Sequence, residues 1–228
     1  MIQPHIDSLL LYVAPQTDDL VRGKEEYFTR TGGEVHEDDR CYEQRMQAFF
    51  NWYLFDRKQG DATPVERYLR EKGKELPAKD KDVLLGCTLS KLSLYEYRGT
   101  GGIFSRPAKG QVRVRDAFTG EDFDVSERRQ MHGLEVGDLF EARLVPHDQS
   151  FQFSTSFTYH PREMRRMIFK EIKRRKKIGP VDARAFVWEL ERMALQQERF
   201  RNVVITAIYN FETPFLSKRP KPEAQPRG

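Results

Sequence analysis

Basic side chains are concentrated in one short segment, 161–177, with the sequence PREMRRMIFKEIKRRKK. It contains nine lysines and arginines and only two glutamates, so its formal charge is +7 in a chain whose net charge is +4. In a helix that turns about 100° per residue, eight of the nine lie on one half of the surface: Arg162, Arg165, Arg166, Lys170, Lys173, Arg174, Lys176 and Lys177. The opposite arc is apolar and carries Met164, Met167, Ile168 and Ile172. Clustered cations displace counterions from phosphates, so these eight residues form a candidate polyanion-binding site.

The charge pattern alone leaves the partner open. RNA, DNA or a ribonucleoprotein would supply phosphates, and an acidic protein partner would supply carboxylates. A third interpretation is a solvated face that balances the rest of the chain, because the sequence outside 161–177 and the basic tail 217–228 carries a charge of −6. A helix lying on a membrane surface is less favoured, because the apolar arc has no tryptophan.

A break at Gly179-Pro180 separates the basic helix from a second predicted helix, which begins near Val181. Two helices joined by a tight turn could indicate a helix-turn-helix, in which the second helix reads bases in the major groove. Here that second helix carries Asp182, Glu189 and Glu191, which phosphates would repel. The pattern therefore disfavours sequence-specific binding to duplex DNA.

No set of residues typical of an active site is visible in the sequence. A group of carboxylates surrounds one predicted hairpin and, with Glu141 and Arg143, loosely resembles a metal-dependent nuclease site: Asp116, Glu121, Asp122 and Asp124. Carboxylates that are simply solvated at a turn are the favoured explanation. The five histidines and two cysteines lack the spacing of metal ligands. We therefore expect a non-enzymatic binding protein with no catalytic residues, no metal and no cofactor.

Alternating residues predict a small sheet in the middle of the chain. Phe151, Phe153 and Phe157 share one face of a predicted strand, where they could stack bases on an oligonucleotide-binding barrel or fill its core, and the core is favoured. Arg113 and Arg115 alternate with valines and are candidates for contacts on the solvent side.

The whole chain is predicted to have an α+β fold: a helical region (1–92), a small antiparallel β-barrel or curled sheet (93–159), a basic helical pair (160–212) and a disordered tail (213–228). Helices are expected at 17–31, 37–56 and 76–92, and from the capping box at Thr63 to about Lys72. The segment 203–209 fits either a helix or a strand. The apolar run 9–14 is too short for a membrane span or a signal peptide, so we expect a cytoplasmic protein without integral membrane association.

Several stretches have a familiar order: FFNWYLFD (49–56), TPVERYL (63–69), KLSLYEY (91–97), VRDAFTGE (114–121) and VGDLFEARLVP (136–146). This order resembles a bacterial family of unassigned function, some members of which carry a SEC-C zinc motif, a short cysteine-rich module, at a terminus. The resemblance covers about 41–157, so the basic helix lies outside it. The chain lacks the cysteine cluster, so the resemblance implies a fold and no zinc site.

Overall fold

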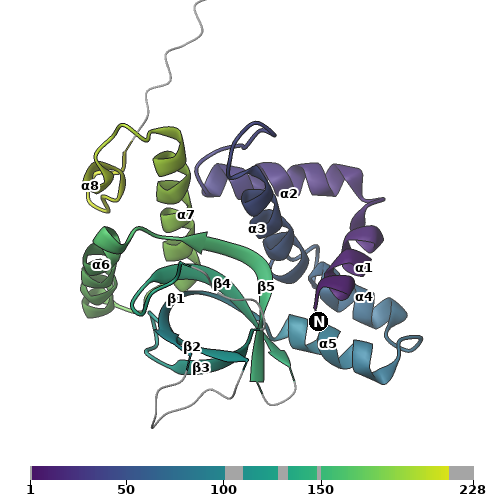
Figure 1. The fold of residues 1–228 in the computed structure, drawn as a ribbon. Helices are drawn as coiled ribbons and strands as arrows, with labels where there is room; N and C mark the ends of the chain where they lie inside the picture. The colour runs from purple at the N-terminus through teal and green to yellow at the C-terminus, as the bar shows by residue number, and fades with distance from the viewer. Residues whose placement is uncertain (1, 101–109, 128–132, 148–149, 216–228) are drawn as a thin grey trace, which may run out of the picture.

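A closed β-barrel forms the centre of the molecule, with helices packed around it (Figure 1). The computed structural model describes residues 2–100, 110–127, 133–147 and 150–215. In Figure 1 the N-terminal helices lie on one side of the barrel, and α6 and α8 lie on the other. This arrangement confirms the predicted α+β fold, with helices before and after a small barrel.

Five helices precede the barrel and share one hydrophobic core: α1 (Gln3–Val13), α2 (Thr17–Arg30), α3 (Tyr42–Phe55), α4 (Pro64–Lys72) and α5 (Ala78–Thr88). Phe49 and Tyr53 of α3 are buried at its centre, whereas Phe50 of the same helix is only half-buried. Helix α3 packs on β5, and α5 packs on β4. The second contact is close, because a Cβ atom on Gly86 would lie 2.4 Å from the carbonyl oxygen of Pro146.

Helix α4 begins at the capping box predicted from the sequence. The Thr63 hydroxyl accepts a hydrogen bond from the backbone N–H of Glu66 at 3.4 Å. In return, the Glu66 carboxylate accepts one from the backbone N–H of Thr63 at 2.7 Å. The two bonds satisfy backbone donors that the first helical turn leaves free, which fixes the start of the helix.

The barrel contains the strands β1 (Lys91–Gly99), β2 (Gln111–Asp116), β3 (Asp122–Ser126), β4 (Leu139–His147) and β5 (Ser150–Tyr159). Their order around the barrel is β1-β2-β3-β5-β4, and β4 closes the barrel by pairing with β1. The pairs are antiparallel except for β3 with β5, in which Val125 lies opposite Phe151. This is the strand order of the oligonucleotide-binding (OB) barrel, a Greek-key fold.

The interior of the barrel is filled by residues that alternate along the strands. Val114, Val125 and Phe140 are fully buried, and the rings of Phe140 and Phe153 lie 5.9 Å apart between centroids. Phe157 is half-buried against the same cluster. The alternating phenylalanines of β5 therefore contribute to the core, as the favoured interpretation expected.

After the barrel come a short 3-10 turn, η1 (Arg162–Met164), and the helices α6 (Arg165–Ile178), α7 (Ala183–Arg199) and α8 (Ile205–Ile208). The undecided segment 203–209 thus contains a short helix. None of the helices in the described ranges combines the length and apolar character needed to cross a bilayer. Most of the predicted disordered tail, 213–228, lies outside the described residues.

Candidate polyanion interface

Helix α6 is fixed to the protein by its apolar side. Met164, Ile168 and Ile172 are buried in a cluster that includes Phe186 and Leu190 of α7. Because this side is removed from solvent, the opposite, basic side is the one that the helix exposes to solvent.

The ninth basic residue of the segment, Arg175, lies on the apolar side and serves packing. Its guanidinium lies 4.8 Å from the centre of the Phe186 ring and donates to both carboxylate oxygens of Glu189 at 2.7 and 2.8 Å. Arg174 and Arg175 both donate to Glu171. The Arg174 guanidinium, together with that of Arg175, lowers the pKa of Glu171 to about 2. The charge of Arg174 is therefore offset within the helix itself.

Two more of the eight predicted site residues are also engaged by carboxylates of the protein. Arg162 donates to both oxygens of Asp138, at 2.6 and 2.9 Å, and pairs with Glu135 at 2.7 Å. Arg165 pairs with the buried carboxylate of Glu96. These arginines dock the start of the basic segment on the barrel and offer little free charge.

The remaining five predicted residues are exposed, and within the described part of the chain none of them forms an ion pair: Arg166, Lys170, Lys173, Lys176 and Lys177. Four of them, Arg166, Lys170, Lys173 and Lys177, follow one another at i, i+4, i+7 and i+11 and thus lie within about 60° of helical arc. At about 1.5 Å per residue this cationic row is about 16 Å long. Lys176 flanks it.

The outer face of β2 and β3 differs from the cationic row, because each arginine there is matched by an aspartate on the opposite strand. Arg113 donates to both oxygens of Asp124 at 2.7 and 2.9 Å, and Arg115 does the same with Asp122 at 2.8 and 2.9 Å. OB barrels bind oligonucleotides at this face. Here the cross-strand pairs offset the charges that the sequence suggested for solvent-side contacts.

The acidic residues around the hairpin are likewise engaged in separate contacts. Asp116 accepts from Lys91 at 2.7 Å and from the backbone N–H groups of Phe118 and Thr119, while Glu141 points into a different, buried cluster. Within the described residues no group of three histidine, cysteine or acidic side chains is arranged to hold a metal ion. The loose likeness of these sequence positions to a metal-dependent nuclease site is therefore not matched by the arrangement of their side chains in the described residues.

A buried ionic cluster, which the sequence did not indicate, joins the helices to the barrel. Arg45 of α3 pairs with Glu191 of α7 at 3.2 Å, and the hydroxyl of Tyr27 donates to the same carboxylate at 2.7 Å. Arg45 also donates to the backbone carbonyl of Thr31 at 2.9 Å. Both charged side chains of the pair are only 4% exposed, so each relies on the other for compensation.

A second part of this cluster is centred on His160, which lies between Glu141 and Tyr209. Its Nε2 is 3.0 Å from Glu141 Oε1, and its Nδ1 is 3.0 Å from the Tyr209 hydroxyl. Burial lowers the pKa of His160 to about 3, and burial together with the charge of Glu191 raises the pKa of Glu141 well above its usual value. Glu141, Glu191 and Arg143 line an enclosed cavity with room for about one water molecule. These groups are closed to a larger substrate and stabilise the interior.

Arg143 shows why the sequence did not reveal this cluster. It is 1% exposed and pairs with Asp56, which also pairs with Arg184 of α7 at 2.8 Å. A charged residue on a strand of a small barrel is ordinarily expected on the solvent side. Strand β4 is instead buried on both faces, because helices cover the barrel wall. Residues Leu139–Val145 are all buried, which becomes apparent only once those helices are placed and not from the sequence.

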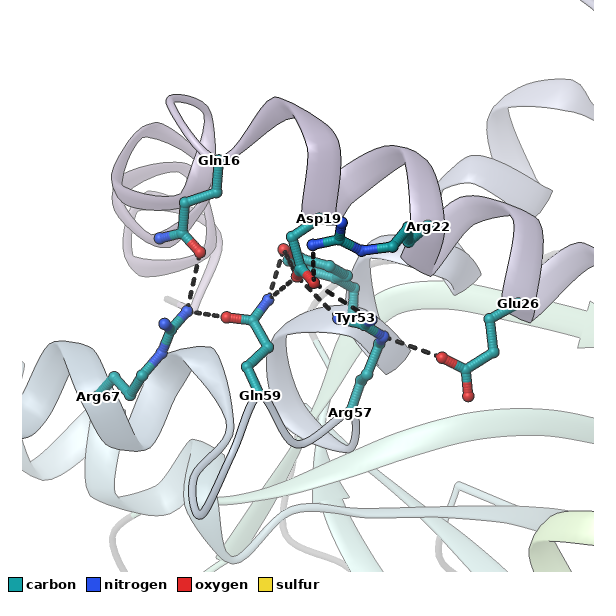
Figure 2. A network of polar contacts seen from close by, with 8 residues as sticks. All are labelled: Gln16, Asp19, Arg22, Glu26, Tyr53, Arg57, Gln59 and Arg67. Atoms are coloured by element: carbon teal, nitrogen blue, oxygen red, sulfur yellow. Dashed lines mark hydrogen bonds and ion pairs between the residues drawn. The ribbon is translucent and has the colours of Figure 1, made fainter.

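A third polar network links α2, α3 and α4, and its groups point toward one another (Figure 2). Asp19 accepts from Arg57 at 2.8 Å and from the Tyr53 hydroxyl at 2.8 Å, and Gln59 bridges Asp19 to Arg67. Burial alone would raise the pKa of Asp19, but the bonds from Arg57 and Tyr53 outweigh it and lower that pKa. The network therefore ties the helices together.

Comparison with known proteins gives a family and no activity. Residues 29–189 match a family described as a family of unknown function (DUF7986). The chain belongs to this family. No curated protein and no solved structure matches the chain.

The region shared with this family is wider than the resemblance noted in the sequence, which covered about 41–157. It extends through the barrel and includes all of α6 and the first residues of α7. The family match therefore includes the basic helix, which the resemblance over 41–157 did not cover. The cationic row falls within the matched residues, as do Arg45, Glu141 and His160 of the buried cluster, whereas Tyr27, Glu191 and Tyr209 of that cluster lie outside them.

Proposed function

We propose that this protein is a non-enzymatic binding protein that contacts nucleic acid or another polyanion through helix α6. The observation that supports the proposal most is the cationic row, whose four charges have no internal partner in the described residues, whereas the neighbouring arginines of the segment do. The eight predicted site residues thus divide into three that fix the helix and five that can contact a partner.

The cationic row is costly to the free protein. Like charges at i, i+4, such as Arg166 with Lys170 and Lys173 with Lys177, destabilise a helix by about 0.2–0.5 kcal/mol per pair. A polyanion would relieve this repulsion and would lose condensed counterions as it bound. The binding energy would come from both effects, and it would fall as salt is added.

Burial of the apolar side favours a polyanion over a membrane surface. A helix that lies on a bilayer inserts its apolar face into the lipid, and in α6 that face is already packed against α7 through Ile168 and Ile172. Apart from Ile178 at its C-terminal end, the exposed residues of α6 are all charged. We further propose a cytoplasmic location, in keeping with the short apolar run 9–14. On the basis of the sequence resemblance alone, we also propose a bacterial origin and a distant relation to the bacterial family with SEC-C members.

A charge-matched pair of variants tests the function. The row variant replaces Arg166, Lys170, Lys173 and Lys177 with glutamine. The control variant replaces four exposed lysines of α4, α5 and the segment between them with glutamine: Lys72, Lys74, Lys79 and Lys81. The net charge therefore changes by the same amount in both variants. Binding to sheared genomic DNA, fragmented total RNA and polyglutamate is measured by gel shift at about 50 mM salt.

We expect the row variant to lose at least about 100-fold in affinity, since four cations each contribute to counterion release. The control variant should stay within about threefold of the wild type. Equal losses in the two variants would mean that net charge and not the helix is responsible, which would contradict the proposal. Binding of polyglutamate in preference to both nucleic acids would instead favour an adaptor that docks on an acidic protein.

A further inference from the structure

We infer that the cationic row binds the phosphate backbone of a double-stranded nucleic acid and does so without reading its sequence. This inference rests on the proposed function and specifies the partner of the same site. It is carried by the spacing of the four cations, by the chemistry of the side chains around them and by the absence of a base-stacking surface on α6.

The spacing of the cationic row suits a rigid array of charge. Its members are separated along the helix axis by about 6, 4.5 and 6 Å, and the buried Met164, Ile168 and Ile172 hold the helix in place over this length. A duplex carries one negative charge per about 1.7 Å of its axis. A row about 16 Å long therefore faces several phosphates in any register, without a need to order a flexible strand.

Single-stranded nucleic acids are usually held by aromatic side chains on which bases stack. Helix α6 has one aromatic residue, Phe169, which is half-buried and covered by the Arg165 guanidinium 5.0 Å from its ring centre. Among the described residues, the exposed large aromatic side chain is Tyr159, which is 51% exposed and belongs to β5. The cationic row itself therefore offers charge without stacking.

The side chains on α6 are also poorly suited to reading bases. The segment 161–177 contains no asparagine, glutamine, serine or threonine, which are the neutral residues that commonly contact base edges. Three of the four members of the row are lysines, which act on phosphates as point charges. Recognition should therefore be uniform across sequences.

The same composition argues against an acidic protein. Protein–protein interfaces have an apolar core and are depleted in lysine relative to the rest of the surface. The apolar residues along the middle of α6, Ile168 and Ile172, are buried inside this protein, and the exposed Ile178 is a single residue at the C-terminal end of the helix. A backbone of phosphates needs no apolar core, and lysine and arginine are its usual contacts.

The inference is tested with the full chain by fluorescence anisotropy on four probes of equal length: duplex DNA of two unrelated sequences, duplex RNA and single-stranded DNA. Four phosphate contacts predict a slope of log affinity against log salt of about −3.6 on duplex DNA and about −2.8 on a single strand. For affinities that are equal at 1 M salt, this difference in slope alone makes binding to the duplex about tenfold tighter at about 50 mM salt. The two duplex sequences should agree within about threefold, and the DNA and RNA duplexes show which helical form is preferred.

Two single variants sharpen the result. Lys173→Gln should reduce the duplex slope to about −2.7, by the loss of one contact. Tyr159→Ala should leave duplex affinity unchanged within about twofold, whereas loss of a stacked base would cost about fivefold or more. Tighter binding to the single strand, a loss on Tyr159→Ala, or a strong preference between the two duplex sequences would each overturn the inference.

Failure of the inference and failure of the proposed function give different results. If the row variant loses binding to every probe but the duplex has no advantage, the polyanion function stands and the duplex assignment is wrong. If the row variant binds every probe as well as the wild type does, both are wrong.

Discussion

The imidazole of His160 and the carboxyl group of Glu141 are in contact inside the protein, with 3.0 Å between Nε2 and Oε1 and side-chain exposures of 0% and 2%. Burial lowers the pKa of the ring to about 3 and raises the pKa of the carboxyl group well above its usual value. Burial thus favours the neutral form of each group, in which the carboxyl group holds the proton of the pair.

This pair predicts how stability depends on pH. In the unfolded chain the two groups have pKa values of about 4.3 and 6.5. Because folding raises the pKa of Glu141, its contribution to stability is lost as the pH rises from about 4.3 through the folded pKa, by up to about 1.4 kcal/mol per pH unit. Because folding lowers the pKa of His160, its contribution is lost as the pH falls from about 6.5 to about 3. The two slopes have opposite signs, so they offset each other where both apply.

The measurement is urea unfolding at pH 5.5, 6.5, 7.5 and 8. Glu141→Gln removes the raised carboxyl pKa and leaves the low pKa of His160. Between pH 5.5 and 6.5 this variant should gain stability with pH more steeply than the wild type, because the opposing contribution of Glu141 is gone, although its overall stability can differ. The same slope in both proteins would show that Glu141 is ionised in the fold.

The buried pair Arg45–Glu191 should be far more important for stability than an exposed pair. Arg45→Met leaves the Glu191 carboxylate without its cation in a place that is 4% exposed, and loss of one partner of a buried pair costs about 3–5 kcal/mol. Arg115→Met breaks the pair with Asp122, whose side chains are 40% and 35% exposed, and should cost less than about 1 kcal/mol. Chemical denaturation of the two variants compares the costs directly. Similar values for both would contradict the assignment of the buried cluster as a structural link.

Two neighbouring phenylalanines of α3, Phe49 and Phe50, give a second test of the core. Phe49 is 2% exposed, so Phe49→Ala should lower the free energy of unfolding by about 3–5 kcal/mol. Phe50 is half-buried, and Phe50→Ala should cost clearly less. A thermal or urea melt of the two variants is sufficient, and the reverse order would mean that Phe50 is the more deeply packed ring.

Neighbouring residues on α6 should differ in binding because they differ in pairing. Lys173 has no ion pair in the described residues, whereas Arg174 pairs with Glu171 at 2.7 Å. Lys173→Gln should therefore reduce the salt slope of polyanion binding by about 0.9, and Arg174→Gln should reduce it by less. Salt titration of the two variants on one probe decides between them, and a greater effect of Arg174 would argue that its pair with Glu171 opens on binding.

Local signals in the sequence predicted most of the elements. A helix within 37–56, the capping box at Thr63, the hairpin flanked by Asp116 and Asp122 and the basic helix are all present, because each depends on residues close together in the chain. The helix ends were less accurate: the helix expected over 37–56 is α3 at Tyr42–Phe55, and that over 76–92 is α5 at Ala78–Thr88. The residues before α3 are instead in turns.

What could not be predicted depends on contacts between distant segments. The internal partners of Arg162 and Arg165 come from the barrel, so the sequence alone could not separate them from the free cations of α6. Glu141 and Arg143 could not be assigned to the interior without knowing that helices cover β4. The fold class could be predicted from periodicity. The division of the eight candidate residues into ion-paired and unpaired ones could not, because ion pairing depends on the tertiary structure.

The hydrogen bond from Tyr27 to Glu191 spans 164 residues of sequence, and this has a consequence for how the chain folds as it is synthesised. The helices α2 and α3 leave the ribosome long before α7, which carries the carboxylate that their buried arginine needs. Until then Arg45 has no ionic partner, and burying it alone would be unfavourable. The N-terminal helices should therefore stay loosely packed during synthesis and close only when α7 emerges, so that the two ends of the chain become ordered together.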